Sequence, residues 1–190
     1  MDLPIYNQAE QFVFDSFNKI DKPEQLKHFV RAVHWLKVLS PDADEALLVA
    51  AIAHDIERGF RQKDILEKKN TGDYTGLDFL RPHEERGAEI IGDFLKNLKV
   101  DADFIERVKM LVSRHEEGGN DDQNLLKDAD SVSFFENNVS LFLDKKSLEA
   151  GKEKVKQKFD WMFNRITSEK AKQIAQPFYE EAMRSLNSSL

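Results

Sequence analysis

The sequence contains no cysteine among its 190 residues. This absence excludes disulfide bonds, thiolate metal ligands and cysteine nucleophiles. Any bound metal must therefore be held by histidine, aspartate and glutamate side chains. The sequence also lacks an apolar run of membrane-spanning length and a signal-peptide pattern. We therefore expect a cytoplasmic protein that makes no membrane contact.

An excess of positive charge is missing as well. Lys and Arg number 28 against 35 Asp and Glu, which gives a net charge of −7. No segment carries a dominant basic tract, and this argues against general nucleic-acid binding, although a local cationic pocket remains compatible with it. Hydrophobic residues make up 41% of the chain, which is enough for a real core. We expect one domain over residues 1–190.

Period-two runs of β-branched residues are also absent, whereas apolar residues recur at helical spacing. The sequence therefore predicts an all-α fold. Asp42 and Glu45 have the spacing of a capping box, Pro82 is expected to open a helix, and Pro177 to kink or interrupt the last one. The expected helices cover about residues 5–19, 23–39, 43–55, 62–69, 82–98, 101–116, 122–143, 147–165 and 168–187, with a loop at 70–76.

A polar pair ends one of the most apolar segments. Residues 46–53 are all apolar, and His54 and Asp55 follow directly. An imidazole and a carboxylate are costly to bury without partners. A candidate site must therefore supply something that satisfies both side chains at once.

His28 is the natural neighbour of this pair. The helices on either side of Pro41 are joined by a tight turn and should be antiparallel. His28 lies 13 residues before Pro41 and His54 lies 13 residues after it, so both should sit at the same height. His34 falls on a different face, and we expect it to be a packing or surface residue.

Two more histidines and one aspartate extend the set. His83 is expected in the first turn of one helix and His115 in the last turn of the next, so an antiparallel arrangement would bring them together. Asp130 lies on an otherwise apolar helix beside Val132. A carboxylate in that position needs a cation or hydrogen-bond donors.

This ordered set resembles the ligand pattern of the HD superfamily of metal-dependent phosphohydrolases, which is named after its adjacent His-Asp pair. The resemblance covers about residues 24–136, whereas the helices within 147–187 carry no part of it. At two positions the sequence differs from the motifs of several named branches of the superfamily. Ile56-Glu57-Arg58 follows the His-Asp pair, and Ser131 follows the Asp-Ala-Asp motif. The matching segments are His28-Phe29-Val30-Arg31, Ala50-Ala51-Ile52-Ala53-His54-Asp55-Ile56, His83 to Ile91, Ile105 to Val108 with His115, and Asp128-Ala129-Asp130.

The resemblance implies an all-α HD-domain helical bundle with additional C-terminal helices. It also implies one or two divalent transition metals per chain, drawn from Mn, Fe, Co, Ni and Zn. His28, His54, Asp55 and Asp130 would hold the first metal. His83 and His115 would hold a second, with Asp55 bridging the two. These assignments are what the resemblance implies, and each is an expectation for the structure.

The implied activity is hydrolysis of a phosphomonoester or phosphodiester in a nucleotide or another small metabolite, through a metal-activated water. Asp55 would then be catalytic as well as a ligand. Among the basic residues that flank the motif, we favour Arg58 and Lys127 as contacts for the substrate phosphate, because they are close to ligands in the sequence. The Phe-rich stretch Phe134–Phe142 is expected to be core.

Two other functions share this pattern. Some HD-fold proteins carry the same six ligands around a di-iron centre and are oxygenases. An HD module can also bind a nucleotide or a protein partner with its site catalytically silent. The C-terminal helices could pack on the domain or form a homodimer interface, and the sequence does not decide between these arrangements.

Overall fold

The computed structural model describes residues 3–60 and 77–188, and within these ranges the chain is helical with no strand. The predicted all-α fold is confirmed. The expected helix at 62–69, the loop at 70–76 and Arg61 lie outside the described residues. The long helices are α1 (Pro4–Lys19), α2 (Glu24–Leu39), α3 (Glu45–Ala53), α6 (Leu77–Asn97), α7 (Ala102–Val112), α8 (Asp121–Asn137), α11 (Lys152–Asn164) and α12 (Glu169–Ser188).

Shorter elements connect them. A single helical turn, α4 (Glu57–Phe60), follows α3. Between α8 and α11 the chain passes through α9 (Val139–Leu141), a π-helical segment (Phe142–Lys146) and α10 (Ser147–Ala150). The expected single helix at 122–143 therefore ends earlier, at Asn137.

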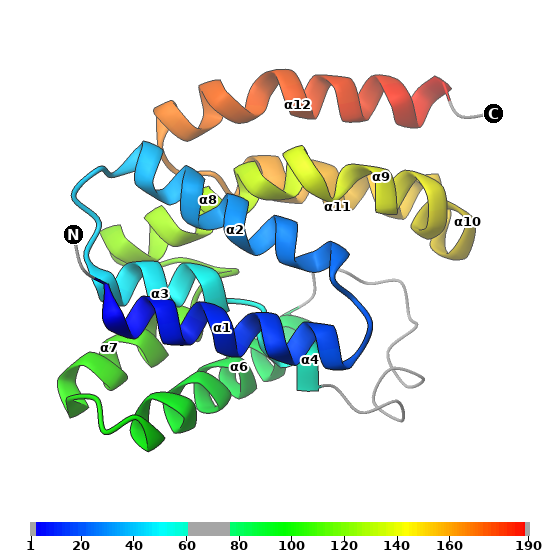
Figure 1. The fold of residues 1–190 in the computed structure, drawn as a ribbon. Coiled ribbons are helices and arrows are strands. Elements are labelled where there is room, and N and C mark those ends of the chain that lie inside the picture. Colours follow the sequence, from blue (N-terminus) through cyan, green and yellow to red (C-terminus); the bar gives the residue numbers. More distant parts are fainter. Residues whose placement is uncertain (1–2, 61–76, 189–190) are drawn as a thin grey trace.

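Helix α3 lies at the centre of the fold, in contact with α1, α2, α7 and α8 (Figure 1). Residues 46–53 are all buried, because an apolar helix with no polar face is stable only when neighbours cover every side. Its end therefore delivers His54 and Asp55 into the interior of the protein.

The start of α3 differs from the expected capping box. Asp44, not Asp42, caps the helix, and its side chain accepts a hydrogen bond from the Leu47 N–H at 3.0 Å. Glu45 instead accepts from the free N–H groups of Ile5 and Tyr6 at 2.8 and 2.9 Å, and so caps the first turn of α1.

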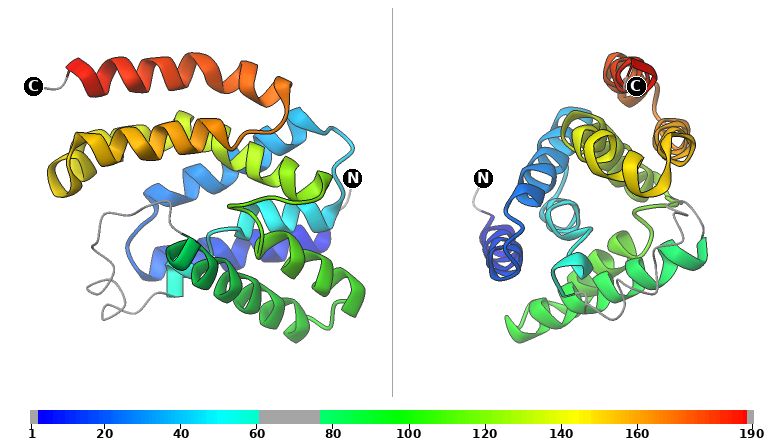
Figure 2. Two further views of the ribbon diagram at one scale, coloured as in Figure 1. Left: turned by 180° about the vertical axis from the view of Figure 1, so that it is seen from behind. Right: turned by 90° about the vertical axis from the view of Figure 1, so that its right-hand side faces the viewer.

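Helices pack around α3 in pairs that carry the candidate residues. The α6–α7 hairpin lies on one side, and α2 packs against α8 on the other (Figure 2). Helices α11 and α12 pack on each other and on α8, so α8 has a partner on two faces. This arrangement places the C-terminal helices against the element that bears Asp130.

The buried apolar residues form two clusters. The first joins α1, α2, α3, α6, α7 and the start of α8. The second joins the end of α8 to α11 and α12 and includes Phe134, Phe135 and Phe159. Trp35 and Leu39 of α2 pack against both clusters. The expectation of one domain over residues 1–190 stays a prediction.

Two prolines lie inside helices rather than at their ends. Helix α6 begins at Leu77 and includes Pro82, and α12 runs through Pro177 without interruption. A proline removes one backbone donor, but buried apolar residues on both sides of it hold each helix. In α6 these are Leu80 and Ala88. Gly151, with φ +87°, separates α10 from α11 and breaks the expected helix at 147–165.

In the described part of the chain, no helix combines the length and the apolar character that crossing a bilayer demands.

Candidate metal centre

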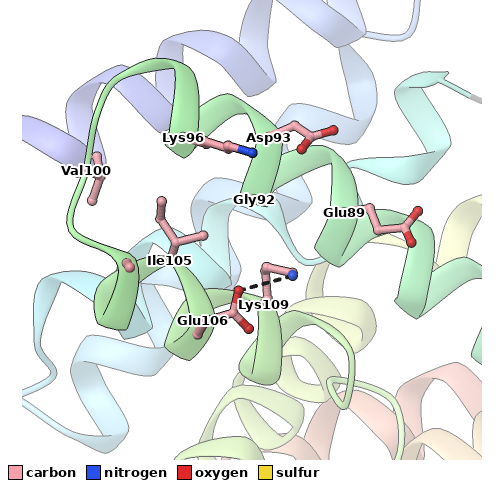
Figure 3. Close-up of a pocket in the computed structure, with 9 residues that line it drawn as sticks. Glu89, Gly92, Asp93, Lys96, Val100, Ile105, Glu106 and Lys109 are labelled. Atoms are coloured by element: carbon pink, nitrogen blue, oxygen red, sulfur yellow. Dashed lines mark hydrogen bonds and ion pairs between the residues drawn. The ribbon is translucent and has the colours of Figure 1, made fainter.

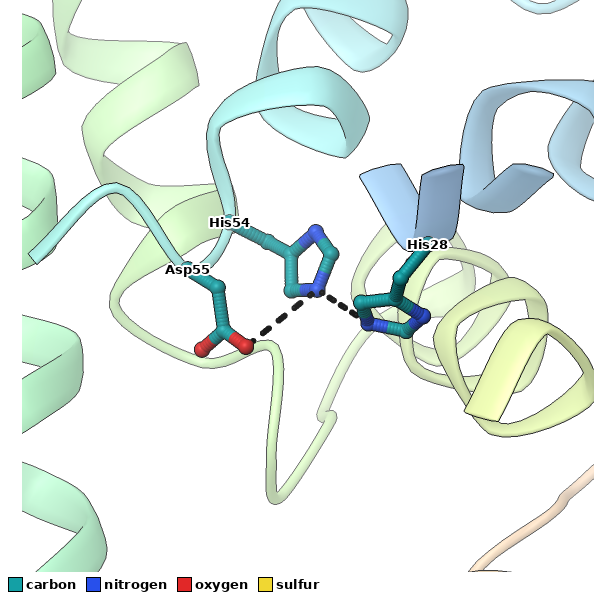
Figure 4. Close-up of side chains that lie close together, drawn as sticks. All are labelled: His28, His54 and Asp55. Atoms are coloured by element: carbon teal, nitrogen blue, oxygen red, sulfur yellow. Dashed lines mark hydrogen bonds and ion pairs between the residues drawn. The ribbon is translucent and has the colours of Figure 1, made fainter. Parts of the chain in front are cut away.

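Four of the predicted ligands meet at the end of α3. His28 Nε2 lies 3.3 Å from His54 Nε2 and 3.1 Å from Asp130 Oδ1. His54 Nε2 lies 3.4 Å from Asp130 Oδ1 and 3.9 Å from Asp55 Oδ2. The close-up shows the His28 and His54 rings and the Asp55 carboxylate turned toward one another (Figure 4). All four side chains are buried.

The other two predicted ligands face the second oxygen of Asp55. His83 Nε2 lies 2.7 Å from Asp55 Oδ1, and His115 Nε2 lies 3.7 Å from the same atom. The ligand atoms of these three residues all lie within 4.8 Å of one another. Asp55 therefore presents one carboxylate oxygen to each half of a six-residue cluster.

Each imidazole is held through its other nitrogen. His54 Nδ1 lies 2.9 Å from the Ala51 carbonyl, and His115 Nδ1 lies 2.8 Å from the Val112 carbonyl. A carbonyl can only accept, so Nδ1 carries the proton in both rings. In the neutral form, Nε2 then directs a lone pair into the cluster, as a metal ligand requires.

The Nδ1 atoms of His83 and His28 also carry the proton and donate a hydrogen bond. His83 Nδ1 lies 3.0 Å from a carboxylate oxygen of Glu57, which also only accepts. His28 Nδ1 lies 2.9 Å from Ser133 Oγ, whose hydroxyl donates to the His28 carbonyl at 2.7 Å. Because that hydroxyl proton is already used, Ser133 accepts from Nδ1. In all four neutral rings, Nε2 is thus the nitrogen without a proton, and it faces the cluster.

The two central carboxyl groups are held ionised. Burial alone would raise the pKa of Asp55, but Arg58 and the two facing histidines outweigh it and hold the pKa well below 3.8. Burial likewise opposes ionisation of Asp130, but Arg165 and His54 hold its pKa well below 3.8. The cluster therefore carries two negative charges at neutral pH.

The pKa values of His83 and His115, which face Asp55 Oδ1, are shifted in the opposite direction, upward. Burial lowers the pKa of His83 and His115, but attraction to Asp55 outweighs it in both, so their pKa values lie above 6.5. Glu57 adds to the effect at His83, and Glu116 at His115. Without a metal, protons on His83 and His115 supply the positive charge beside Asp55 that a bound cation would supply.

The donor set fits a divalent transition metal. The atoms that face the cluster are imidazole nitrogens and carboxylate oxygens, the ligands that Mn, Fe, Co, Ni and Zn accept. Asp55 Oδ1 and His115 Nε2 are buried, and neither has a hydrogen-bond partner among the described residues. Buried polar atoms are normally satisfied, so these two atoms point to a missing cation.

Arg58, one of the two predicted phosphate contacts, lies at this cluster. Its Nε is 2.9 Å from Asp55 Oδ2, and 42% of its side chain is exposed. Lys127 does not join it. The Lys127 ammonium is buried against Thr167, Asn124 and Asp128, at 2.5, 3.2 and 3.8 Å. Lys127 is close to Asp130 in the sequence, but its ammonium is directed toward Thr167 and lies outside the lining of both cavities described below.

The other flanking basic residues pair elsewhere, and His34 is exposed on α2. Arg31 pairs with Glu136, Arg86 with Glu57, and Arg114 with Glu117.

Two residues of α11 and its C-terminal end reach the cluster and carry no signal in the HD pattern. Arg165, 6% exposed at its side chain, pairs with Asp130 Oδ2 and with Glu116. Its Nε also donates to Ser131 Oγ at 2.9 Å. Lys158 lies about two helical turns earlier and is 8% exposed. Both were missed because the resemblance ends before α11.

A small inner cavity of about 40 Å³ opens onto the cluster. A larger outer cavity of about 330 Å³ shares five of its lining residues and leads outward. The shared residues are His28, Asp55, Arg58, Asn138 and Phe142. Phe134 and Phe142 both line the inner cavity. Phe134 and Phe135 are buried, as expected.

A larger cavity, of about 580 Å³, lies elsewhere. It is formed by α6 and α7, with Glu89 and Asp93 on one helix and Glu106 and Lys109 on the other (Figure 3). Glu106 and Lys109 pair with each other at 3.2 Å. None of the six clustered residues lines it.

The comparisons with known proteins agree with this fold. Residues 8–186 match a family described as a domain of unknown function (DUF4202). No curated protein matches the chain. A crystal structure described as a predicted HD superfamily hydrolase, from an uncultured Thermotogales bacterium, is similar with a TM-score of 0.58 and 19% identity. The similarity covers 95% of this chain and 88% of that one.

The predicted HD-domain helical bundle is therefore confirmed as the fold class, and the C-terminal helices are included in the match. The chain belongs to the DUF4202 family, and its fold is similar to that of the predicted HD superfamily hydrolase.

Proposed function

We propose that this protein is a metal-dependent phosphohydrolase that acts on a nucleotide or another small phosphoester. The observation that carries the proposal is the position of Asp55. Its Oδ2 faces His54, which clusters with His28 and Asp130, while its Oδ1 faces His83 and His115. An ionised carboxylate between two sets of imidazole donors is the arrangement that a bridged pair of cations requires.

The chemistry of the bound metal follows from its charge: divalent ions at such a site lower the pKa of a coordinated water and polarise phosphoryl oxygens. His28, His54, Asp55 and Asp130 would hold the first ion, and Asp55, His83 and His115 the second. Mn, Fe, Co, Ni and Zn all suit these ligands.

The chain itself supplies the charges around the reacting group. Arg58 is anchored by Asp55 and lines both cavities, so its guanidinium is placed to meet a phosphate that enters from outside. Preorganised cations of this kind stabilise the charge that develops during phosphoryl transfer. We assign Arg58 to phosphate binding and leave Lys127 out of that role.

The test combines metal content with turnover. The protein is purified without chelators or a histidine tag, its metals are measured by elemental analysis, and phosphate release from a panel of small phosphoesters is followed. We expect about two metals per chain and hydrolysis of at least one phosphoester. Asp55→Ala should abolish both. Full phosphatase activity of the Asp55→Ala protein after metal removal would sink the proposal.

The two alternatives give different readouts. A di-iron oxygenase would contain iron, show a mixed-valent iron spectrum and consume O₂ without releasing phosphate. A silent binding module would contain no metal even after soaking with Mn²⁺, Fe²⁺ or Zn²⁺. The six converging ligands favour the two enzymes over the silent module, and the cations at the cavity favour phosphate chemistry over the oxygenase.

A further inference from the structure

We propose that the turn between α11 and α12, residues 165–168, completes the first metal position, and that Arg165 is the positioning residue through which this turn acts. Docking of the turn on α8 and binding of the first metal then stabilise each other. The inference rests on the metal centre of the proposed function and adds to it a part of the chain that follows the HD pattern. It is carried by the contacts between the turn and residues 128–131 of α8.

Asp128 anchors the backbone of the turn. Its two carboxylate oxygens accept hydrogen bonds from the N–H groups of Thr167 and Ser168, at 2.8 and 2.7 Å. These N–H groups precede α12, which begins at Glu169, so they have no partner within a helix and need an acceptor from elsewhere. Asp128 is 1% exposed, and the Ile166 side chain is buried in the second apolar cluster. The turn is therefore fixed on α8 by polar and apolar contacts together.

Arg165 connects the anchored turn to the ligand cluster. Its guanidinium pairs with Asp130 Oδ2 and with the Glu116 carboxylate, and its Nε donates to Ser131 Oγ at 2.9 Å. The same guanidinium lies 4.6 Å from the centre of the Trp161 ring. A planar guanidinium with several directed contacts has one orientation. The position of Arg165 is therefore set by its surroundings, and Arg165 in turn sets the Asp130 carboxylate.

Asp130 needs such a donor to keep its orientation. Its Oδ1 faces the Nε2 atoms of His28 and His54, at 3.1 and 3.4 Å. In the neutral rings these nitrogens carry no proton, so they cannot donate to the carboxylate, and their lone pairs face its own. Arg165 binds the opposite oxygen and holds Oδ1 toward the metal position against this repulsion. A bound cation replaces the repulsion with attraction, so the metal and Arg165 support each other.

The second metal position has anchors of its own. The His115 ring is held by the Val112 carbonyl at 2.8 Å from Nδ1, and the adjacent Glu116 N–H donates to Glu84 at 2.8 Å. His83 belongs to α6. Loss of the contacts made by the turn should therefore weaken the first position more than the second. This difference separates a positioning role from a general loss of stability.

The first experiment measures Mn²⁺ binding by competition with a chelator. Asp128→Asn keeps the shape of the side chain but replaces one acceptor oxygen with an NH₂ group, so it cannot accept from both Thr167 and Ser168. We expect one of the two ions to bind about 10- to 100-fold more weakly, as is typical when an outer partner of a ligand is lost, and the other to bind as in wild type.

Asp101→Asn is the matched control. Asp101 also accepts from two backbone N–H groups, those of Asp103 and Phe104 at the start of α7, and it makes no contact with the turn. Its substitution should leave both Mn²⁺ affinities unchanged. Unchanged affinities in Asp128→Asn, or an equal loss at both positions, would overturn the proposal.

Arg165→Lys separates orientation from charge. Lysine keeps a positive charge beside Asp130 but lacks the planar fork of directed N–H groups. The first ion should therefore bind about 10-fold more weakly than in wild type. An affinity equal to that of wild type, or above it, would show that Arg165 does not act by orienting the ligand.

Hydrogen exchange on the wild type guards against variants that fail to fold. By linkage, the metal must stabilise the docked turn by the same factor by which docking raises the metal affinity. The N–H groups of Thr167 and Ser168 should therefore exchange about 10- to 100-fold more slowly with Mn²⁺ than without it. Those of Asp103 and Phe104 should exchange at similar rates in both states. Equal slowing of both pairs, or of neither, would contradict the coupling.

Phosphate release from the phosphoester panel separates this inference from the proposed function. If wild type shows the coupling but hydrolyses no phosphoester, the proposed function fails and the coupling stands. If wild type hydrolyses a phosphoester and both variants bind Mn²⁺ as wild type does, the reverse holds. A wild type that binds no Mn²⁺ overturns both.

Discussion

Arg165 and Asp130 form a buried ion pair in which the guanidinium takes one carboxylate oxygen and leaves the other for the metal centre. Asp130 Oδ1 faces His28 and His54, while Oδ2 faces Arg165. The same guanidinium contacts Glu116, next to the His115 ligand. Arg165 therefore fixes the orientation of one ligand and the backbone beside another, although it lies at the far end of α11.

Loss of Arg165 should be severely destabilising. Arg165→Met leaves two carboxylates buried without their cation, which costs about 3–5 kcal/mol when one partner of a buried pair is removed. The measurement is the free energy of unfolding in urea. Arg184→Met serves as the control, because Arg184 pairs with Glu181 on the surface and should contribute about 0–1 kcal/mol. Equal stability of the two variants would contradict this account.

The metal-free protein should lose stability as pH rises above 6.5, before the Lys158 pKa of about 8 is reached. The pKa values of His83 and His115 are raised in the folded state, so the folded protein binds more protons than the unfolded chain in this window. Their contribution is complete below 6.5 and is lost as pH rises through the folded pKa. Thermal unfolding at a series of pH values, before and after metal loading, measures it.

Two controls test whether His83 and His115 cause this pH dependence of stability. Metal binds the neutral imidazoles, so the loaded protein should not show the decline. His83→Gln should reduce it in the metal-free protein. The window stops below the Lys158 pKa of about 8, because that lowered pKa makes stability rise with pH above it. A metal-free stability that rises between the two limits would refute the assignment.

Ser133 should affect the affinity for the first metal through its hydrogen bond with His28. Ser133→Ala removes the acceptor of the His28 Nδ1 proton, and loss of such an outer partner typically weakens metal binding about 10- to 100-fold. Competition with a chelator of known affinity measures the change. Ser16→Ala is the matched control, because Ser16 is also buried but donates to the Phe12 carbonyl in α1. The two variants should differ in metal affinity but not in fold.

His83→Ala should separate the two metal positions. His83 lies beside the Oδ1 atom of Asp55, so its removal should empty the second position and leave the first filled. Metal content should fall from about two to about one per chain. His34→Ala, on the exposed face of α2, should leave the content unchanged. Loss of both metals in His83→Ala would mean that the positions are not independent.

The clustering of the candidate ligands was predictable because it follows short-range rules. The apolar run before His54 and Asp55 forced that pair into the interior, and the equal distances of His28 and His54 from Pro41 placed them at one height. The helices themselves followed from periodicity. Their boundaries were less accurate at Pro82, since proline is read as a helix start and packing of Leu80 extends the helix before it.

Partners that meet through tertiary packing could not be predicted in the same way. Lys127 was chosen for its distance along the chain from Asp130, but its ammonium is taken up by Thr167. Arg165 is 35 residues from Asp130, and no periodicity links them. Only the docking of α11 on α8 brings such residues together. The one feature of the sequence that could have indicated such a residue is a basic side chain on the buried side of an amphipathic helix.

The candidate ligands and the arginine that pairs with Asp130 lie in different parts of the chain, and this has an evolutionary consequence. The candidate metal ligands lie within residues 28–130, whereas Arg165, which pairs with Asp130, follows α11. Substitutions in and beside α11 can therefore alter the surroundings of the candidate ligands while every one of them is retained. Relatives that share all six ligands need not share a substrate, and the sequence of α11 is the place to sort them into groups.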